Sequence, residues 1–276
     1  MGIALALGAS LTWGLADFFG PLQGRALGAL RTLVYVQLGG LVGIALIVAV
    51  RAAGPHDALA LLAIPAAVSG TLGLFAYYRG IAVGAISIVA PIAGVSAVVP
   101  VIVGIASGES PSALQLTGIA CALVGVFLAA RETGRGGRRR LAAGFGLAVL
   151  AAIGFGGYFP FMHAAGNADF WWASLIFRIT STTVILLAAA AKRPALGVPT
   201  SLLPWLALIG FGDMLGNLLY AAASTTGLVS VTSVLASLYP IVTVVLARLL
   251  LAERVARSQE AGIGLTLAGV ALISAG

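Results

Sequence analysis

Long apolar runs separated by short polar gaps make up nearly the whole chain. The runs are rich in Leu, Ala, Val and Gly and do not alternate between polar and apolar residues, so they predict helices rather than strands. A helix needs roughly 20 apolar residues to cross the hydrocarbon layer of a bilayer. We therefore expect about ten spanning helices, at residues 2–20, 27–50, 58–81, 85–107, 112–130, 141–165, 170–191, 202–225, 228–252 and 259–275.

The composition agrees with a membrane protein. Of the 276 residues, 61% are hydrophobic and only 8% are charged, whereas a soluble domain has roughly 25% charged residues. The first run has no basic residue before it, so we interpret it as a spanning helix rather than a cleaved signal peptide. Cys121 is the only cysteine, which excludes an internal disulfide or a cysteine metal cluster. We expect an all-α, multi-pass protein of the cell (inner) membrane.

The two halves of the chain resemble each other. Three ordered sets of residues recur at a nearly constant shift of 142 to 144 positions. They include Gly14 with Gly156, Gly73 with Gly216, Tyr77 with Tyr220, Glu109 with Glu253, and Gly118 with Gly262. We expect five-helix repeats at 1–130 and 141–276, joined by a basic linker at 131–140. Because five is odd, the second repeat must be inverted relative to the first, as in many secondary transporters.

Basic residues gather in alternate gaps. The gaps after the first, fifth, seventh and ninth expected helices hold eleven Lys and Arg residues, and the other gaps hold only Arg51. Basic loops stay in the cytoplasm, so this bias predicts odd-numbered loops inside and both termini outside. The net charge of +7 follows this pattern, so no nucleic-acid partner is expected.

Polar residues within the expected helices are the candidates for function. An ionisable group at the bilayer centre costs ~2.5–3.5 kcal/mol, so it usually faces a cavity or a partner. In the helix at 202–225, Asp213, Asn217, Tyr220 and Ser224 share one face. This face could be the wall of a substrate cavity, or it could form hydrogen bonds between helices.

Arg178 shares a face of the helix at 170–191 with Trp171, Ser174 and Ser181. Its guanidinium could bind a substrate carboxylate through paired hydrogen bonds. An aspartate on another helix could instead neutralise it, and the sequence leaves both possibilities open; the candidates are Asp213 and Asp17.

Helix 2–20 places Ser10, Trp13 and Asp17 on one face. A desolvated carboxylate at this position could take up and release a proton, which would couple transport to a proton gradient; the alternative is a structural partner for an arginine. Two tyrosines could stack on a ligand or lie at the membrane interface, and His163 is either an interface histidine or a proton relay. The tyrosines are Tyr78 and Tyr239.

Three further features concern packing. Pro100 and Pro240 can bend their helices, and Glu109 is expected to cap the helix that follows it. Small residues line one face of the helices at 112–130 and 259–275, which predicts close contact either between the halves or between protomers. These small residues are Gly118, Ala122 and Gly125, and Gly262, Thr266 and Gly269.

Several of these motifs resemble those of the EamA-type, ten-helix transporters of the drug/metabolite transporter superfamily. They are Trp13-Gly14, Gly108-Glu109 with Gln115 and Gly118, Pro240 followed by Glu253, Gln259 and Gly262, and Arg178. The resemblance implies inverted five-helix repeats around a central cavity, export of amino acids or other metabolites, and fifth and tenth helices outside. Gln37 departs from it by standing roughly where the second half has Arg178. Such proteins commonly have both termini in the cytoplasm, which is opposite to the orientation that the charge bias predicts. We follow the charge bias.

The sequence therefore predicts a secondary transporter that exports amino acids, with aromatic ones as candidates, or similar metabolites by alternating access. The alternatives are a multidrug or other metabolite transporter or uniporter, a channel, and a membrane enzyme. Lys192 is the only lysine, so no phosphate-binding P-loop is present, and the two histidines are not spaced as a metal pair. We expect no enzyme activity, cofactor or metal. The expected partners are a small substrate, lipid and a proton as coupling ion, for a monomer or homodimer.

Overall fold

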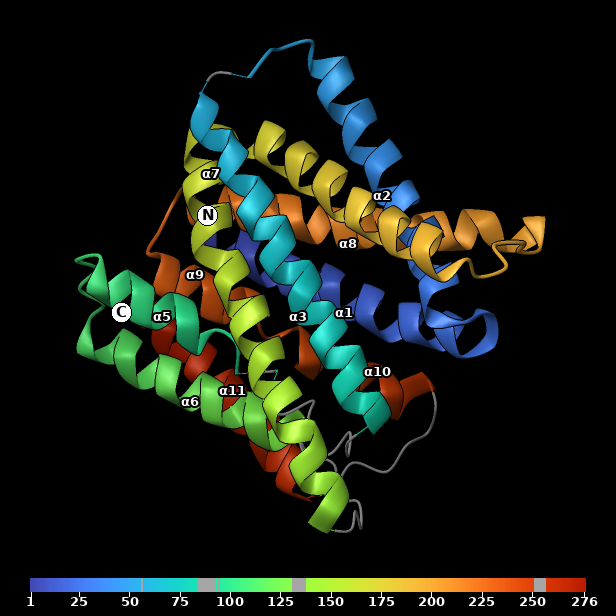
Figure 1. The fold of residues 1–276 in the computed structure, drawn as a ribbon. Helices are drawn as coiled ribbons and strands as arrows, with labels where there is room; N and C mark the ends of the chain where they lie inside the picture. The colour runs from blue at the N-terminus through green and yellow to red at the C-terminus, as the bar shows by residue number, and fades with distance from the viewer. Residues whose placement is uncertain (56, 84–92, 94, 131–137, 251–256) are drawn as a thin grey trace.

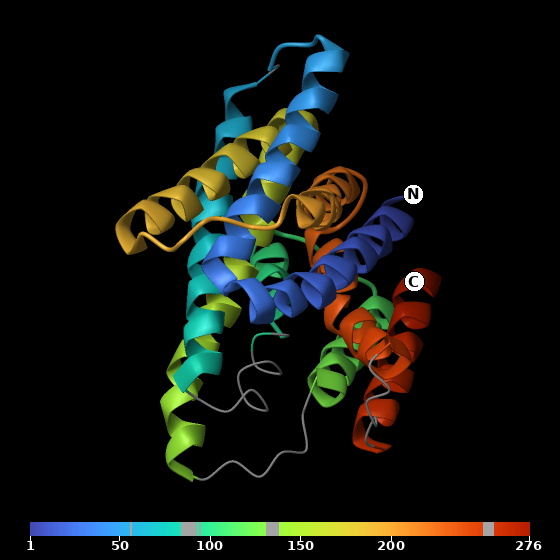
Figure 2. The same cartoon turned by 90° about the vertical axis from the view of Figure 1, so that its right-hand side faces the viewer.

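The computed structural model describes residues 1–55, 57–83, 93, 95–130, 138–250 and 257–276. The regular elements in these ranges are helices, and two views show their arrangement (Figures 1 and 2). In chain order the α-helices are α1 (Gly2–Leu27), α2 (Ala29–Arg51), α3 (Ala63–Val83), α5 (Val98–Ala106), α6 (Ala113–Ala130), α7 (Arg138–Lys192), α8 (Leu203–Ser224), α9 (Val229–Ala236), α10 (Tyr239–Leu250) and α11 (Arg257–Ala275).

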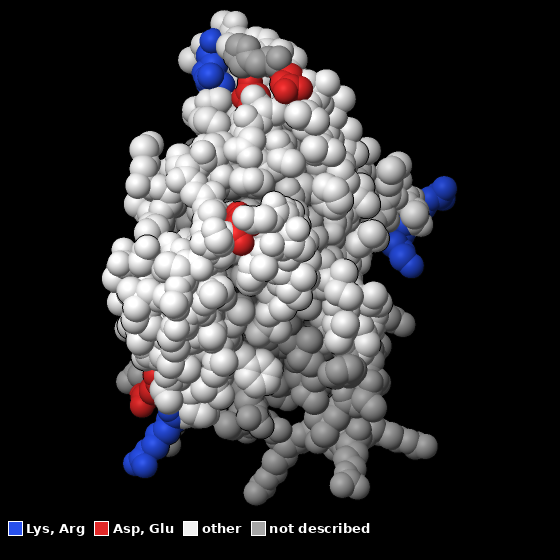
Figure 3. Space-filling model, turned by 90° about the vertical axis from the view of Figure 1, so that its left-hand side faces the viewer, with Lys and Arg blue, Asp and Glu red and all other residues white. Residues whose placement is uncertain are grey.

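The helices have the length and composition of membrane spans. Five stretches of the described residues are long and apolar enough to cross a bilayer. One of them, Gly146–Lys192, has 47 residues, enough for two crossings of roughly 20 residues each. Large apolar side chains such as Leu46 and Leu187 lie exposed on the outside. Figure 3 shows a mostly uncharged surface, with most charged groups near its margins and one acidic group near the middle of the face. The prediction of an all-α membrane protein is confirmed.

Two expected helices, 141–165 and 170–191, form the single element α7. The backbone leaves helical geometry only at Asp169, with φ −165° and ψ 100°. The Asp169 carboxylate accepts hydrogen bonds from the backbone N–H groups of Trp171 (3.0 Å) and Trp172 (3.2 Å), as an N-cap residue does. Asp169 therefore divides α7 into a first limb, 138–168, and a second limb, 170–192, with no loop between them.

The helix expected at 228–252 is interrupted, which corrects the sequence prediction. It consists of α9 and α10, separated by a turn at Ser237 and Leu238. Pro240 follows this turn, and its missing N–H cannot continue the hydrogen bonding of α9. Of the helix expected at 85–107, α5 is the part that the structure describes as helical, and residues 84–92 and 94 lie outside the described ranges.

The first helix of each half makes the same kind of close contact with a valine of the other half. These first helices are α1 and the first limb of α7. A Cβ added to Gly14 would lie 2.4 Å from the Cβ of Val242, and one added to Gly156 would lie 2.5 Å from that of Val99. Gly156 and Val242 follow Gly14 and Val99 by 142 and 143 positions. The sequence repeat is thus a structural repeat.

A second pair of contacts follows the same rule. A Cβ on Gly216 of α8 would lie 2.5 Å from the Trp13 ring of α1, and one on Gly73 of α3 would lie 2.9 Å from the Phe155 ring of α7. Trp13 and Phe155 are 142 positions apart, and Gly73 and Gly216 are 143 apart. Each half therefore places its third helix against the first helix of the other half.

Helices α6 and α11 lie side by side at one edge of the molecule (Figures 1 and 2). A Cβ on Gly118 would lie 2.7 Å from the carbonyl oxygen of Gly269, and one on Gly125 would lie 2.7 Å from that of Gly262. Small residues allow such close approach of membrane helices. Of the two alternatives that the sequence left open, the structure shows contact between the halves of one chain.

The helices end at two faces. At the face that we name the termini face, Gly2 packs on Thr226, and Gly276 packs on Ser112. At the opposite end, the basic face, Arg31 donates a hydrogen bond to the carbonyl oxygen of Gly197 in the connection after α7 (3.1 Å). Lys192 and Arg193 begin the connection that contains Gly197, so they lie at the basic face as well.

Candidate functional site: a polar cavity between the repeats

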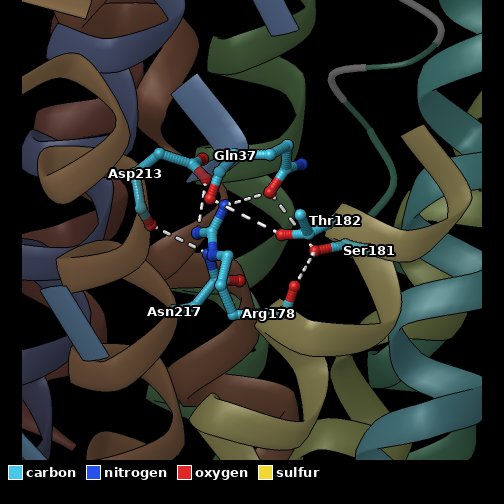
Figure 4. Close-up of polar contacts among 6 residues, drawn as sticks. All are labelled: Gln37, Arg178, Ser181, Thr182, Asp213 and Asn217. Carbon is cyan, nitrogen blue, oxygen red and sulfur yellow. Dashed lines mark hydrogen bonds and ion pairs between the residues drawn. The ribbon is translucent and has the colours of Figure 1, made fainter. Parts of the chain in front are cut away.

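Arg178 lies at the centre of a buried polar cluster (Figure 4). It projects from the second limb of α7 and is only 1% exposed. Its Nη2 contacts the Asp213 carboxylate of α8 at 2.6 Å, and its Nη1 donates to Oε1 of Gln37 on α2 at 2.5 Å. A Cβ on Gly40 would lie 3.1 Å from the Arg178 Cζ, so this glycine leaves space for the guanidinium. The buried charge is thus both neutralised and hydrogen-bonded, as burial requires.

Neighbouring polar groups hold this cluster in place. The Ser181 hydroxyl donates to Oε1 of Gln37 at 3.3 Å, and the Thr182 hydroxyl donates to the Gln37 backbone carbonyl at 3.5 Å. The Asn217 amide donates to the backbone carbonyl of Asp213 at 2.8 Å. The structure therefore brings together four residues that the sequence singled out: Gln37, Arg178, Asp213 and Asn217.

A cavity of about 100 Å³ adjoins the cluster. Asp17, Gln37 and Asp213 supply its charged and amide groups. Asp17 is exposed to the cavity and the Asp213 side chain is 30% exposed, whereas Arg178 does not line it. The remaining lining residues are Ala16, Gly20, Gly24, Ala29, Thr32, Leu33, Val36, Leu74 and Ile209.

The cavity lies in the half of the molecule nearer the basic face. Its lining includes the end of α1 and the start of α2, which meet at Gly28. Its volume corresponds to a few water molecules of ~30 Å³ each and is below the ~300–1,000 Å³ of typical ligand sites. Only part of a metabolite fits into the cavity in this conformation.

Aromatic side chains pack together on the other side of the ion pair. The Trp13 ring lies 5.9 Å from Tyr158, 6.3 Å from Phe159, 6.2 Å from Tyr220 and 6.3 Å from Tyr239, between ring centroids. Three of these pairs are edge-to-face, a favourable arrangement for aromatic rings. We name these five residues the aromatic cluster. It lies toward the termini face, because Trp13 precedes Asp17 on α1 and Tyr220 follows Asp213 on α8.

Two tyrosines of this cluster differ in their hydrogen bonding. The Tyr220 hydroxyl donates to the Phe159 carbonyl at 3.0 Å and lies 2.9 Å from the Ser233 hydroxyl. Tyr220 therefore forms hydrogen bonds between helices, which is the second of the two alternatives that the sequence left open for its face of α8. The Tyr158 side chain is 6% exposed, and its hydroxyl has no hydrogen-bond partner within the described ranges. Tyr158 is not among the candidate residues that the sequence pattern suggested.

Glu109 caps a different helix from the one expected, which is a correction. Its carboxylate accepts hydrogen bonds from the backbone N–H groups of Val229 and Ser230, the latter at 3.0 Å. These residues begin α9, in the other half of the chain. The following helix, α6, has its own capping box, because Ser112 and Gln115 exchange hydrogen bonds of 2.9 and 3.1 Å.

Two other candidates lie elsewhere, and the structure does not describe the side chain of a third. The Trp171 ring is covered by the Arg51 guanidinium, 4.5 Å from the ring centroid, near the end of α2. The His163 Nε2 lies 3.1 Å from the Asn167 amide on the same helix, and neither Trp171 nor His163 lines the cavity. The Tyr78 side chain lies outside the part of the chain that the structure describes.

Fold and site together define a class of protein. A polytopic helical protein with two related halves and a polar site between them has the architecture of a secondary transporter. The chain belongs to the EamA-like transporter family, whose model matches residues 1–131 and again residues 142–275. It is therefore a membrane transporter of small metabolites or drugs.

A solved structure supports the same fold. The structure titled "Crystal structure of protein" matches with a TM-score of 0.78 and 19% sequence identity, covering 99% of this chain and 98% of the other. No curated protein matches the sequence. The likeness at this identity concerns the fold alone.

Proposed function

We propose that this protein is a secondary transporter that exports amino acids or similar small metabolites by alternating access. The observation that carries the proposal is the cavity beside Asp17, Gln37 and Asp213. The cavity lies in the half of the molecule nearer the basic face, while the aromatic cluster is packed toward the termini face. A carrier in one of its two states has this arrangement of one accessible and one closed side.

The direction of transport follows from the charges at the ends of the helices. Arg31, Lys192 and Arg193 lie at the basic face, and basic loops face the cytoplasm. The cavity then loads from the cytoplasm, as an exporter requires. The Glu109 contact with α9 joins the two halves near the termini face, so it stabilises closure on the outer side.

A proton is the coupling ion that we propose. Asp17 lines the cavity, and its carboxylate has no hydrogen-bond or ion-pair partner within the described ranges. A carboxylate in a desolvated site can bind and release a proton, and Asp17 lies in the half of the molecule nearer the basic face. Protons and substrate would then move in opposite directions.

Transport by purified protein in liposomes tests this proposal. Liposomes preloaded with unlabelled amino acids should accumulate a labelled amino acid transiently, with saturable initial rates. Gln37→Leu should lower the rate at least tenfold because it removes an acceptor of Arg178. Leu46→Ala changes a side chain that is 62% exposed on the outside of α2 and should leave the rate unchanged. A flux that rises linearly with concentration and shows no counterflow would indicate a channel and contradict the proposal.

A further inference from the structure

The charges that a solute meets in the cavity are negative. Asp17 and Asp213 line it, and no Lys or Arg among the described side chains does. The basic group of the adjoining cluster, Arg178, is 1% exposed, and both of its terminal nitrogens are engaged by Asp213 and Gln37. Arg178 neutralises one carboxylate, so the site retains one negative charge in excess when both aspartates are ionised.

The two carboxylates also have free acceptor capacity. Asp213 uses Oδ2 for Arg178, and its Oδ1 accepts no hydrogen bond from the residues that the structure describes. Asp17 accepts none from them either. An unpaired carboxylate inside a spanning region is costly, so a positively charged partner would stabilise it.

Two independent features of the aromatic cluster suit a positively charged group. Trp13 lies one helical turn before Asp17, and the faces of indole rings attract cations. Tyr158 is nine-tenths buried, its hydroxyl has no hydrogen-bond partner within the described ranges, and its ring centroid lies 5.9 Å from that of Trp13. An ammonium group offers three donors and no acceptor, and it would find acceptors on Asp17, on Asp213 and on this hydroxyl.

We infer that the site binds its substrates through an organic ammonium group, held between Asp17 and Asp213, and that Arg178 does not bind a substrate carboxylate. The inference rests on the proposed function, of which it names the substrate class: amines, and amino acids through their amino group. Arg178 acts as a positioning residue that holds Asp213 in place. The rest of the substrate extends toward the basic face, because about 100 Å³ does not hold a whole amino acid.

Three ligands with the same ring and different charged groups test the inference. They are phenethylamine, phenylalanine and 3-phenylpropionate, and binding is measured by thermal shift and calorimetry on the purified full-length protein. Phenethylamine and phenylalanine should bind, and 3-phenylpropionate should bind at least tenfold more weakly. Equal or tighter binding of 3-phenylpropionate, or no binding of phenethylamine up to about 10 mM, would overturn the inference.

Variants identify the carboxylate. Asp17→Asn should weaken phenethylamine binding at least tenfold, and Asp17→Glu should restore part of it. The control variant Asp57→Asn removes the same charge from a loop residue whose carboxylate accepts a hydrogen bond from the Leu59 backbone N–H. It should bind phenethylamine as tightly as the unchanged protein does. An Asp17→Asn variant that stays folded, as judged by its unfolding temperature, and binds phenethylamine unchanged also contradicts the inference.

Transport assays separate the two proposals. Counterflow of 3-phenylpropionate without counterflow of either amine would leave the carrier proposal standing and refute the ammonium site. Binding of phenethylamine that depends on Asp17 but is never accompanied by transport would support the ammonium site and refute the carrier.

Discussion

Two equivalent helix contacts in this transporter have the same packing and different chemistry. Gly216 lies against Trp13 where α8 meets α1, and Gly73 lies against Phe155 where α3 meets α7. Near the first contact, α8 carries Asp213. The position 143 residues before Asp213 is Gly70, which has no charge to offer. The repeat thus determines how closely the helices approach, and single polar residues of one half make the site.

The difference has a physical basis. Alternating access between inverted repeats requires two packings of similar energy, so the glycine contacts occur in both halves. A substrate has no such symmetry, and it needs charged groups in one arrangement. Arg178 and Gln37 show this division directly, because roughly equivalent positions of the two halves carry a cation and its hydrogen-bond acceptor, 2.5 Å apart.

The largest effect is expected at the ion pair. Asp213→Ala leaves the buried Arg178 guanidinium without its counter-charge, and breaking a buried pair in this way costs about 3–5 kcal/mol. Thermal unfolding in detergent should show a large loss of stability, much of it regained in the double variant Arg178→Met, Asp213→Leu. Asp17→Asn, which breaks no pair, should change stability by less than about 0.5 kcal/mol. Similar losses from the two aspartate variants would show that Asp213 is not the paired one.

The repeated glycine contacts should be equally sensitive in the two halves. Gly14→Ala and Gly156→Ala each place a Cβ within 2.5 Å of a valine Cβ, and such overpacking costs about 1–3 kcal/mol. Both variants should lower the unfolding temperature by similar amounts. Gly264→Ala on α11 meets open space and should gain about 0.5–1 kcal/mol from reduced backbone freedom. A lower unfolding temperature in only one of these two glycine variants would contradict the structural equivalence of the two contacts.

Much of the architecture was predictable because membrane helices obey local rules. Runs of apolar residues locate the spans, and the small residues Gly118 and Gly125 indicated the face on which α6 meets α11. The spacing of Trp171, Ser174, Arg178 and Ser181 placed Arg178 on a helix face. Each inference needed only one helix and its period.

The rest depends on contacts between distant segments. Glu109 precedes α6 by four residues and caps α9, 120 residues further along the chain, which no local pattern indicates. The sequence likewise offered Asp17 and Asp213 as equal partners for Arg178, and only the packing of α8 on α7 selects Asp213. Tyr158 was missed because its importance lies in an absent hydrogen bond, which is a property of the packed structure.

Removing the Glu109 cap should have a smaller effect than the two preceding changes. Glu109→Ala leaves the N–H groups of Val229 and Ser230 without their acceptor, and loss of an N-cap costs about 1 kcal/mol. Hydrogen exchange of the 228–236 segment should become faster, and the segment after Ser112 should be unaffected because α6 has its own cap. Glu109→Gln retains an acceptor and should show a weaker effect. Unchanged exchange in α9 would show that the contact does not hold the two halves together.

The smallest effect distinguishes two tyrosines of the aromatic cluster. Tyr220→Phe removes hydrogen bonds to Phe159 and Ser233, and a hydrogen bond between membrane helices contributes about 0.6 kcal/mol. Tyr158→Phe removes a hydroxyl that has no partner within the described ranges, so stability should be unchanged or slightly higher. The same variant should bind phenethylamine more weakly, because the ammonium group loses an acceptor. A loss of stability in Tyr158→Phe equal to that in Tyr220→Phe would mean that the Tyr158 hydroxyl already has a partner in the folded protein, and its place beside the ligand would then have to be abandoned.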